Sequence, residues 1–261
     1  MRLSGQVAVV TGAASGMGRA LCHELAREGV RLGLLDRNSD GLSSLADELR
    51  ARGTTCSQAT ADVGDRQAVG GAIKALTTEL GAVNLLVACA GITGATLVDD
   101  LAVEQTEAIV RVNLLGVVYA IEAVLPDMLA RGSGQIVALS SLAGCRGMPF
   151  AAAYSASKAA LANYLESLRP PLRRRGIAVT TVLPGFVRTP LMTNALVQPP
   201  MAMMEPEGAA RHILRAIRRR SRVYAFPWST SLLLGVLRCL PAWLYDWSMA
   251  RGAAHIPNVK Y

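Results

Sequence analysis

Short apolar runs alternate along the chain with longer segments of helical periodicity, and most of the helical segments end at a glycine. The apolar runs predict strands at residues 7–10, 31–35, 54–60, 83–88, 135–139, 177–183 and 222–226. The segments between them predict helices at residues 16–28, 41–52, 65–80, 104–131, 152–175 and 206–220. Apolar strands that alternate with helices are typical of a parallel sheet covered on both faces. The pattern therefore predicts one doubly wound α/β domain.

The size and composition agree with a single well-packed domain. The chain has 261 residues, of which 51% are hydrophobic and 18% charged, which excludes intrinsic disorder. Its 24 glycines and 12 prolines show no strict period, which excludes a collagen-like fibre. Five scattered cysteines and three histidines lack the spacing of a disulfide framework or a metal site, so we expect neither. Residues 1–6 are short and polar, and we expect a cytoplasmic protein.

The net charge of +8 has two readings. Much of it lies in arginine runs at residues 173–175 and 218–220, each at the end of a predicted helix, where cations also complement the helix dipole. The runs are either solvated helix ends or a docking patch for an acidic partner. We expect no nucleic-acid binding, because the charge has no interleaved aromatic residues and no recognised module accompanies it.

The tail, residues 228–261, forms an apolar extension. Residues 231–249 are rich in leucine and tryptophan, but Arg238, Pro241 and Asp246 interrupt them, so they lack an uncharged span of about 20 residues. The segment is expected to be either a helix of the core or of an oligomer interface, or a segment that contacts a membrane surface.

A glycine-rich turn, TGAASGMG, follows the first predicted strand and opens the first helix. Gly12 permits a tight turn, while Gly16 and Gly18 let the backbone approach a pyrophosphate at the helix N-terminus. The second strand ends at Asp36, where a carboxylate accepts hydrogen bonds from an adenosine ribose and repels a 2′-phosphate. This favours NAD over NADP, although the neighbouring Arg37 provides a guanidinium that can hold such a phosphate.

Tyr154 and Lys158 are four residues apart in a predicted helix and therefore share a face. An ammonium beside a phenol stabilises the phenolate and lowers its pKa, so that the tyrosine can exchange a proton with an alcohol or a carbonyl. Ser140 and Ser141 follow the fifth strand, where a hydroxyl can hydrogen-bond the reacting oxygen. Asn113 lies in a long apolar helix and, taken alone, is a buried amide that needs partners.

Together these motifs resemble the short-chain dehydrogenase/reductase family over residues 3–227. TGAASGMG is similar to the family's TGxxxGxG turn, and Tyr154 to Lys158, YSASK, to its YxASK motif. The resemblance implies a Rossmann-type doubly wound sheet of about seven strands, with residues 1–227 as the catalytic domain. It also implies that Tyr154 is the general acid/base, Lys158 binds the nicotinamide ribose and Ser141 orients the carbonyl. Asn113 would hold a water that links Lys158 to solvent.

The resemblance implies further contacts with the cofactor. The residues assigned to cofactor binding are Gly12, Ser15, Gly16, Met17, Gly18, Asp36, Arg37, Asp62, Val63, Cys89, Ala90, Gly91, Tyr154, Lys158, Pro184, Gly185, Val187 and Thr189. One position departs from the family pattern, because its NNAG reads ACAG here. The second asparagine usually ties neighbouring strands together, and we expect Cys89 to lose that polar tie.

The expected substrate is a bulky hydrophobic alcohol or ketone. The lid at residues 186–205 is rich in methionine, whose flexible thioether adapts to irregular apolar ligands; alternatively, the lid packs on the core. The loop at residues 142–153, with Met148 and Phe150, is expected to form the opposite wall. The resemblance implies a homodimer or homotetramer. The main hypothesis is an NAD-dependent alcohol dehydrogenase or ketone reductase. A reductase of acyl groups on a carrier protein, using NADPH, is the alternative, and a non-enzymatic nucleotide-binding scaffold is disfavoured.

Overall fold

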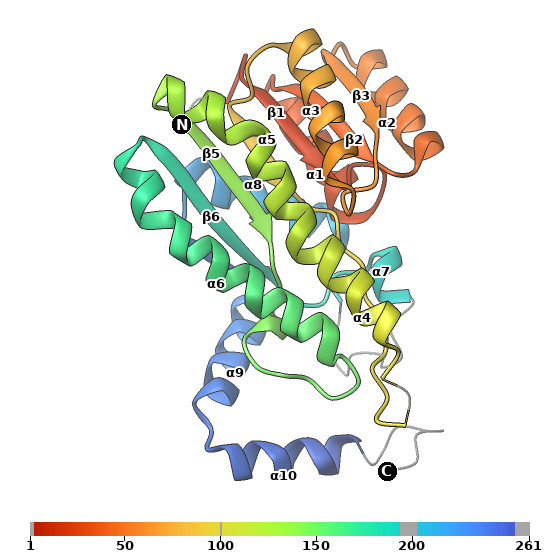
Figure 1. Ribbon diagram of the computed structural model, residues 1–261, viewed down its shortest axis with the longest axis vertical. Coiled ribbons are helices and arrows are strands. Elements are labelled where there is room, and N and C mark those ends of the chain that lie inside the picture. The colour runs from red at the N-terminus through yellow and green to blue at the C-terminus, as the bar shows by residue number, and fades with distance from the viewer. Residues whose placement is uncertain (1–2, 100, 194–202, 254–261) are drawn as a thin grey trace.

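The apolar runs form a single parallel sheet in the computed structural model, which describes residues 3–99, 101–193 and 203–253. The strand order is β3-β2-β1-β4-β5-β6-β7, and every neighbouring pair is parallel (Figure 1). The strands are β1 (Val7–Thr11), β2 (Arg31–Asp36), β3 (Cys56–Thr60), β4 (Leu85–Ala88), β5 (Gly134–Leu139), β6 (Ile177–Pro184) and β7 (Val223–Phe226). The predicted doubly wound Rossmann-type fold is confirmed.

The connections between strands are helical. The helices are α1 (Gly16–Arg27), α2 (Ser39–Ala51), α3 (Arg66–Leu80), α4 (Val103–Val110), α5 (Gly116–Arg131), α6 (Ala152–Arg174), α7 (Pro190–Thr193), α8 (Pro206–Arg219), α9 (Trp228–Cys239) and α10 (Ala242–Ala253), with a π-helical turn η1 (Arg111–Leu115) and a 3-10 turn η2 (Leu142–Gly144). The observed helix boundaries differ from the predicted ones where a capping side chain sets the first residue of the helix. Helix α2 begins two residues earlier than predicted, because the Asn38 side chain accepts a hydrogen bond from the Gly41 amide at 3.0 Å.

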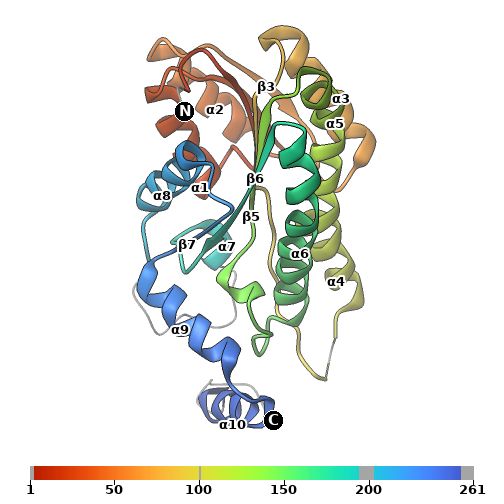
Figure 2. The same ribbon diagram turned by 90° about the vertical axis from the view of Figure 1, so that its left-hand side faces the viewer.

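Both faces of the sheet are buried, and successive strand residues alternate between two apolar clusters. Val10 belongs to the cluster beneath α1, α2 and α8, whereas Val9 belongs to the cluster beneath α3, α5 and α6. Figure 2 shows the sheet nearly edge-on, with these two groups of helices on its opposite sides. This two-sided burial explains why the strands are continuous apolar runs rather than alternating ones.

The helix predicted over residues 104–131 is interrupted. It consists of α4, the π-turn η1 and α5, and the Gly116 amide donates to the Arg111 carbonyl five residues earlier. Among the described helices, this run is the one long and apolar enough to cross a membrane by length and composition. Its residues Val117, Ile121 and Val124 are buried in the core beside the sheet, which accounts for its apolar character.

The tail does not form one helix. It forms α9 and α10, which are separated at Pro241 and lie beyond the end of the sheet (Figures 1 and 2). Among the residues that the structure describes, neither apolar cluster draws a side chain from these two helices. Trp228, Trp243 and Trp247 are exposed, whereas Tyr245 is buried. The tail therefore contacts the rest of the chain through individual side chains rather than through the two apolar clusters.

Candidate active site

The glycine-rich turn between β1 and α1 is packed backbone against backbone. A Cβ placed on Gly18 would lie 2.0 Å from the Gly12 carbonyl oxygen, and one on Gly12 would lie 2.7 Å from the Ala90 Cα. Gly12 also has a φ of +70°, which side chains disfavour. Ser15 is exposed at the N-cap and its side chain makes no capping bond, so the first amides of α1 are left for an anion. This cradle fits a dinucleotide pyrophosphate.

Asp36, at the end of β2, is fixed against that turn. One of its carboxylate oxygens accepts a hydrogen bond from the Ala14 amide at 3.0 Å, and the other accepts from the Asn38 amide at 3.0 Å. The carboxylate thus lies directly beside the glycine turn. Arg37 follows it and is exposed.

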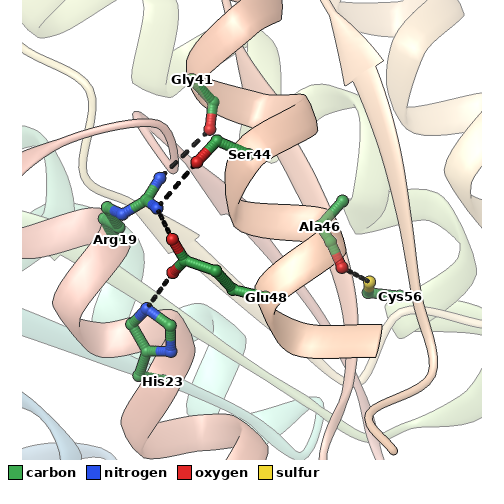
Figure 3. A network of polar contacts seen from close by, with 7 residues as sticks. All are labelled: Arg19, His23, Gly41, Ser44, Ala46, Glu48 and Cys56. Carbon is green, nitrogen blue, oxygen red and sulfur yellow. Dashed lines mark hydrogen bonds and ion pairs between the residues drawn. The ribbon is translucent and has the colours of Figure 1, made fainter. Parts of the chain in front are cut away.

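A polar network joins α1 to α2 beside this corner (Figure 3). Arg19, directly after the last glycine of the turn, donates to the Gly41 carbonyl at 3.2 Å and to the Glu48 carboxylate at 2.7 Å. The other Glu48 oxygen lies 3.3 Å from Nε2 of His23. The network fixes the start of α2 relative to the turn. Sequence reasoning missed it, because the residues are ordinary helix-surface types whose contact depends on how the two helices pack.

The residues after β3 and β4 lie at the same edge of the sheet. Asp62 accepts from the Gly64 amide at 2.8 Å, and a Cβ on Gly116 would lie 2.9 Å from the Val63 carbonyl oxygen, so α5 begins against this segment. Gly91 reaches the catalytic residues, because a Cβ there would lie 3.5 Å from Nζ of Lys158.

Beside Cys89, the Thr11 side chain connects β1 to the end of β4. The Thr11 hydroxyl accepts from the Cys89 amide at 3.2 Å and from the Ala90 amide at 3.3 Å. Burial raises the pKa of the Cys89 thiol to about 12, so it is protonated at neutral pH. The departure from NNAG therefore leaves β1 and β4 connected.

The segment after β6 passes over the glycine turn. Pro184 ends β6, and the Gly185 amide donates to the Phe226 carbonyl at 2.7 Å. A Cβ on Gly16 would lie 3.1 Å from Cγ2 of Thr189, so the threonine contacts the turn. Val187 forms a parallel bridge with Met204 that closes the base of the predicted lid. Residues 194–202 of that lid lie outside the described residues.

Tyr154 and Lys158, both in α6, lie on one face of the helix as their spacing predicts. Nζ of Lys158 is 5.8 Å from the centroid of the Tyr154 ring and donates to the Leu139 carbonyl at 2.9 Å. The Ser141 side chain lies close enough to the Tyr154 hydroxyl to lower the pKa of the phenol. The adjacent Ser140 is buried and donates to the Lys158 carbonyl at 2.7 Å, so the hydroxyl at the phenol belongs to Ser141.

Burial governs the pKa values of Tyr154 and Lys158. Burial raises the pKa of the Tyr154 phenol, and the neighbouring Ser141 side chain lowers it in part. Burial also lowers the pKa of Lys158, to about 8. The protein groups therefore hold the phenol protonated at neutral pH, and the lysine charge is itself held at a cost.

Asn113 comes from the π-turn η1 and is completely buried. Its oxygen accepts from the Ile92 amide at 2.9 Å, and its nitrogen donates to the Ile92 carbonyl at 3.0 Å and to Oγ of Ser157 at 3.0 Å. The side chain thus joins the segment after β4 to α6, next to Lys158. The expected water between Asn113 and Lys158 stays a prediction.

The parts meet at one end of the sheet: the glycine turn, the Asp36 carboxylate beside it, and the Ser141, Tyr154 and Lys158 side chains. A family model described as short chain dehydrogenase matches residues 6–199. The chain belongs to this family. It is therefore an oxidoreductase of a family that uses a nicotinamide cofactor.

Individual relatives extend this assignment. An uncharacterised oxidoreductase of Myxococcus xanthus is 40% identical over 245 residues, which is 94% of this chain and 96% of the relative. A 2-dehydro-3-deoxy-L-rhamnonate dehydrogenase (NAD(+)) of a Sphingomonas species is 37% identical over 73% of this chain and 76% of its own length. A short-chain dehydrogenase/reductase from Burkholderia phymatum, solved in complex with NAD, is 25% identical, with a TM-score of 0.84 over 90% of this chain and 93% of that one.

Proposed function

We propose that the protein is an NAD(H)-dependent oxidoreductase that interconverts a secondary alcohol and a ketone on a bulky hydrophobic small molecule. The observation that carries the proposal is the grouping of Ser141, Tyr154 and Lys158, with Nζ of Lys158 5.8 Å from the centroid of the Tyr154 ring, at the sheet edge that also holds the glycine turn. These groups provide an exchangeable proton, an oxygen-binding hydroxyl and a fixed positive charge within one site.

The proposed mechanism assigns each group a step. The nicotinamide cofactor, when bound, supplies or accepts the hydride. Tyr154 donates its phenolic proton to a ketone oxygen, or removes the proton of an alcohol in the reverse direction. Ser141 donates a hydrogen bond to the same oxygen and so holds it beside the phenol. Lys158 stabilises the phenolate that remains and binds the nicotinamide ribose, and Asn113 keeps the segment after β4 against α6.

NAD is the proposed cofactor because of Asp36. Its carboxylate is held at the adenosine end by two backbone amides, where it repels a 2′-phosphate. The Burkholderia structure with NAD and the NAD(+)-named Sphingomonas relative support the same choice. The residues proposed to hold the cofactor are those assigned from the sequence, with Thr189 and Val187 near the nicotinamide and Asp62 and Val63 near the adenine.

The hydrophobic substrate class follows from the walls proposed for the site. Met204 closes the base of the lid, and Met148 and Phe150 lie in the loop between Ser141 and Tyr154. Apolar walls of this kind favour ligands that bury carbon surface.

The proposal is tested with purified protein, NAD and a panel of hydrophobic secondary alcohols, by the growth of NADH absorbance. We expect Tyr154→Phe to lower kcat by about a thousandfold while the affinity for NADH, measured by fluorescence titration, stays within about twofold. Tyr164→Phe is the matched control, because Tyr164 lies on the same helix against the apolar cluster and keeps full activity. Full activity in Tyr154→Phe would overturn the proposal. A strong preference for NADPH would instead support the carrier-protein reductase.

A further inference from the structure

The loop between the two reacting side chains is held from outside the catalytic domain. It runs from η2 to the start of α6, and so connects Ser141 to Tyr154. Figure 1 shows it at the end of the sheet nearest to α10. Any shift of this loop changes what the hydroxyl and the phenol face.

One peptide unit of the loop is held at both ends. The carbonyl of Gly147 accepts a hydrogen bond from the Tyr245 hydroxyl of α10, and the amide of Met148 donates to Oγ of Ser155 at 3.3 Å. The two groups of a peptide point in opposite directions, so bonds to both fix the orientation of its plane. Ser155 directly follows Tyr154, and the peptide therefore bridges the tail and the catalytic helix.

Arg146 supplies a second connection between the same two segments. Its Nη1 donates to the Leu240 carbonyl at 2.8 Å, and its guanidinium carbon lies 4.0 Å from the centroid of the Tyr245 ring. The guanidinium thus reaches the junction between α9 and α10 and covers the face of the ring that holds the loop. Burial raises the pKa of Tyr245, so its hydroxyl is a donor at neutral pH.

The remaining end of the loop is held by Thr96. Its amide donates to the Phe150 carbonyl at 2.9 Å, and its hydroxyl accepts from the Ala153 amide at 3.3 Å. Phe150 has a φ of +62°, a conformation that a residue with a bulky side chain adopts only under external restraint. The loop shape is therefore imposed by its surroundings rather than by its own sequence.

We propose that Tyr245 and Arg146 are positioning residues that set the substrate-facing loop, residues 145–151, so that the α9–α10 pair is part of the substrate site. This rests on the proposed function for its catalytic readout. Tyr245 and Arg146 act through the 147–148 peptide on Met148, in the wall opposite the lid, and touch neither the cofactor nor the reacting atoms.

The first test measures the loop itself. In Tyr245→Phe the ring stays beneath Arg146 and the hydroxyl is lost. We expect amide hydrogen exchange in residues 145–151 to accelerate about tenfold, while the melting temperature and the NADH affinity stay unchanged. Arg146→Met should accelerate it further, and Arg146→Lys should recover part of the protection. Trp243→Ala, an exposed residue of the same helix, is the matched control and leaves exchange unchanged. Unchanged exchange in Tyr245→Phe would refute the proposal, whatever the enzyme does.

The second test measures the consequence for substrate. With an alcohol that the native enzyme oxidises, we expect Tyr245→Phe to raise KM about fivefold and to change kcat less than twofold, because the loop binds substrate and takes no part in proton transfer. Faster loop exchange with an unchanged KM would refute the positioning role. Absence of turnover in the native enzyme would refute the proposed function and would leave the exchange experiment to judge the contact between tail and loop.

Discussion

The turn proposed to receive the cofactor and the loop proposed to face the substrate are built in different ways. The turn is shaped by missing side chains: at Gly12 and Gly18 the neighbouring backbone occupies the space that a Cβ would need. The loop is shaped by side chains from three separate segments, Tyr245, Ser155 and Thr96, while a Cβ on its own Gly147 would meet nothing within 4 Å. The glycine turn tolerates almost no substitution, whereas the loop changes its shape whenever one of the side chains that hold it is replaced. The inflexible turn suits a cofactor that is common to many enzymes, and the adjustable loop suits substrates that vary.

The sharpest contrast comes from adding one methyl group to each region. We expect Gly18→Ala to lower NADH affinity about a hundredfold, because its Cβ would lie 2.0 Å from the Gly12 carbonyl oxygen and the turn must open. Gly147→Ala is the matched change in the loop and should alter NADH affinity and stability little. Fluorescence titration with NADH and thermal unfolding measure both. Similar losses in the two variants would remove the distinction.

Lys158 should also carry a cost in folding free energy that the glycine turn does not. Burial lowers the pKa of Lys158 to about 8, so its charged form is less stable in the folded protein than in the unfolded chain. We expect Lys158→Met to abolish activity and to raise the free energy of unfolding at pH 7 by about 2 kcal/mol, because the desolvation cost that it removes exceeds the loss of the hydrogen bond to the Leu139 carbonyl. The folded pKa lies below the unfolded one, so the native chain carries the full cost below pH 8. The cost fades as the pH rises toward 10.5, and the advantage of the variant should shrink with it.

Denaturant titrations at pH 7 and pH 10 check this sign. The exposed Lys74 provides the control, because Lys74→Met should leave the stability unchanged at both values. A Lys158→Met protein that is less stable than the native one at pH 7 would contradict the expectation.

The side chain expected to decide between NAD and NADP is that of Asp36. We expect Asp36→Asn to lower kcat/KM for NAD about tenfold and to raise it for NADP, because the variant keeps a hydrogen-bonding oxygen but no longer repels a 2′-phosphate. Asp40→Asn, at the exposed start of α2, is the control. The ratio of the two specificity constants is the measurement, and an unchanged ratio would show that cofactor choice lies elsewhere.

The smallest effect is expected at the network behind the turn. The Arg19–Glu48 pair is 2.7 Å long, but the Glu48 side chain is 45% exposed. Glu48→Gln should therefore cost about 0.5 kcal/mol of unfolding free energy and should leave NADH affinity nearly unchanged, because the glycines of the turn do not depend on this pair for their packing. Asp47→Asn, one residue earlier, serves as the comparison. A large loss of NADH affinity in Glu48→Gln would mean that the turn also depends on distant side chains.

The sequence predicts best what depends on neighbours along the chain. The strands, the glycine turn and the shared face of Tyr154 and Lys158 are local patterns, and the structure has them. The contact between Tyr245 and Gly147 joins residues 98 positions apart, and no periodicity in either segment predicts it. The burial of the Tyr154 phenol, which raises its pKa, likewise depends on everything packed around the ring. The break at Pro241 is local, and the proline in the sequence marks it.

The π-helical turn between α4 and α5 has a consequence for the design of variants. The turn Arg111–Leu115 contains one residue more than a regular helical turn, and each residue advances a helix by about 100°. The surplus residue rotates everything that precedes it relative to everything that follows. Deleting one residue at that point would give a straighter and more regular rod, yet it would swing the Asn113 amide off Ile92 and Ser157. The variant with the more regular helix would therefore lose the contacts that hold the loop after β4 against α6.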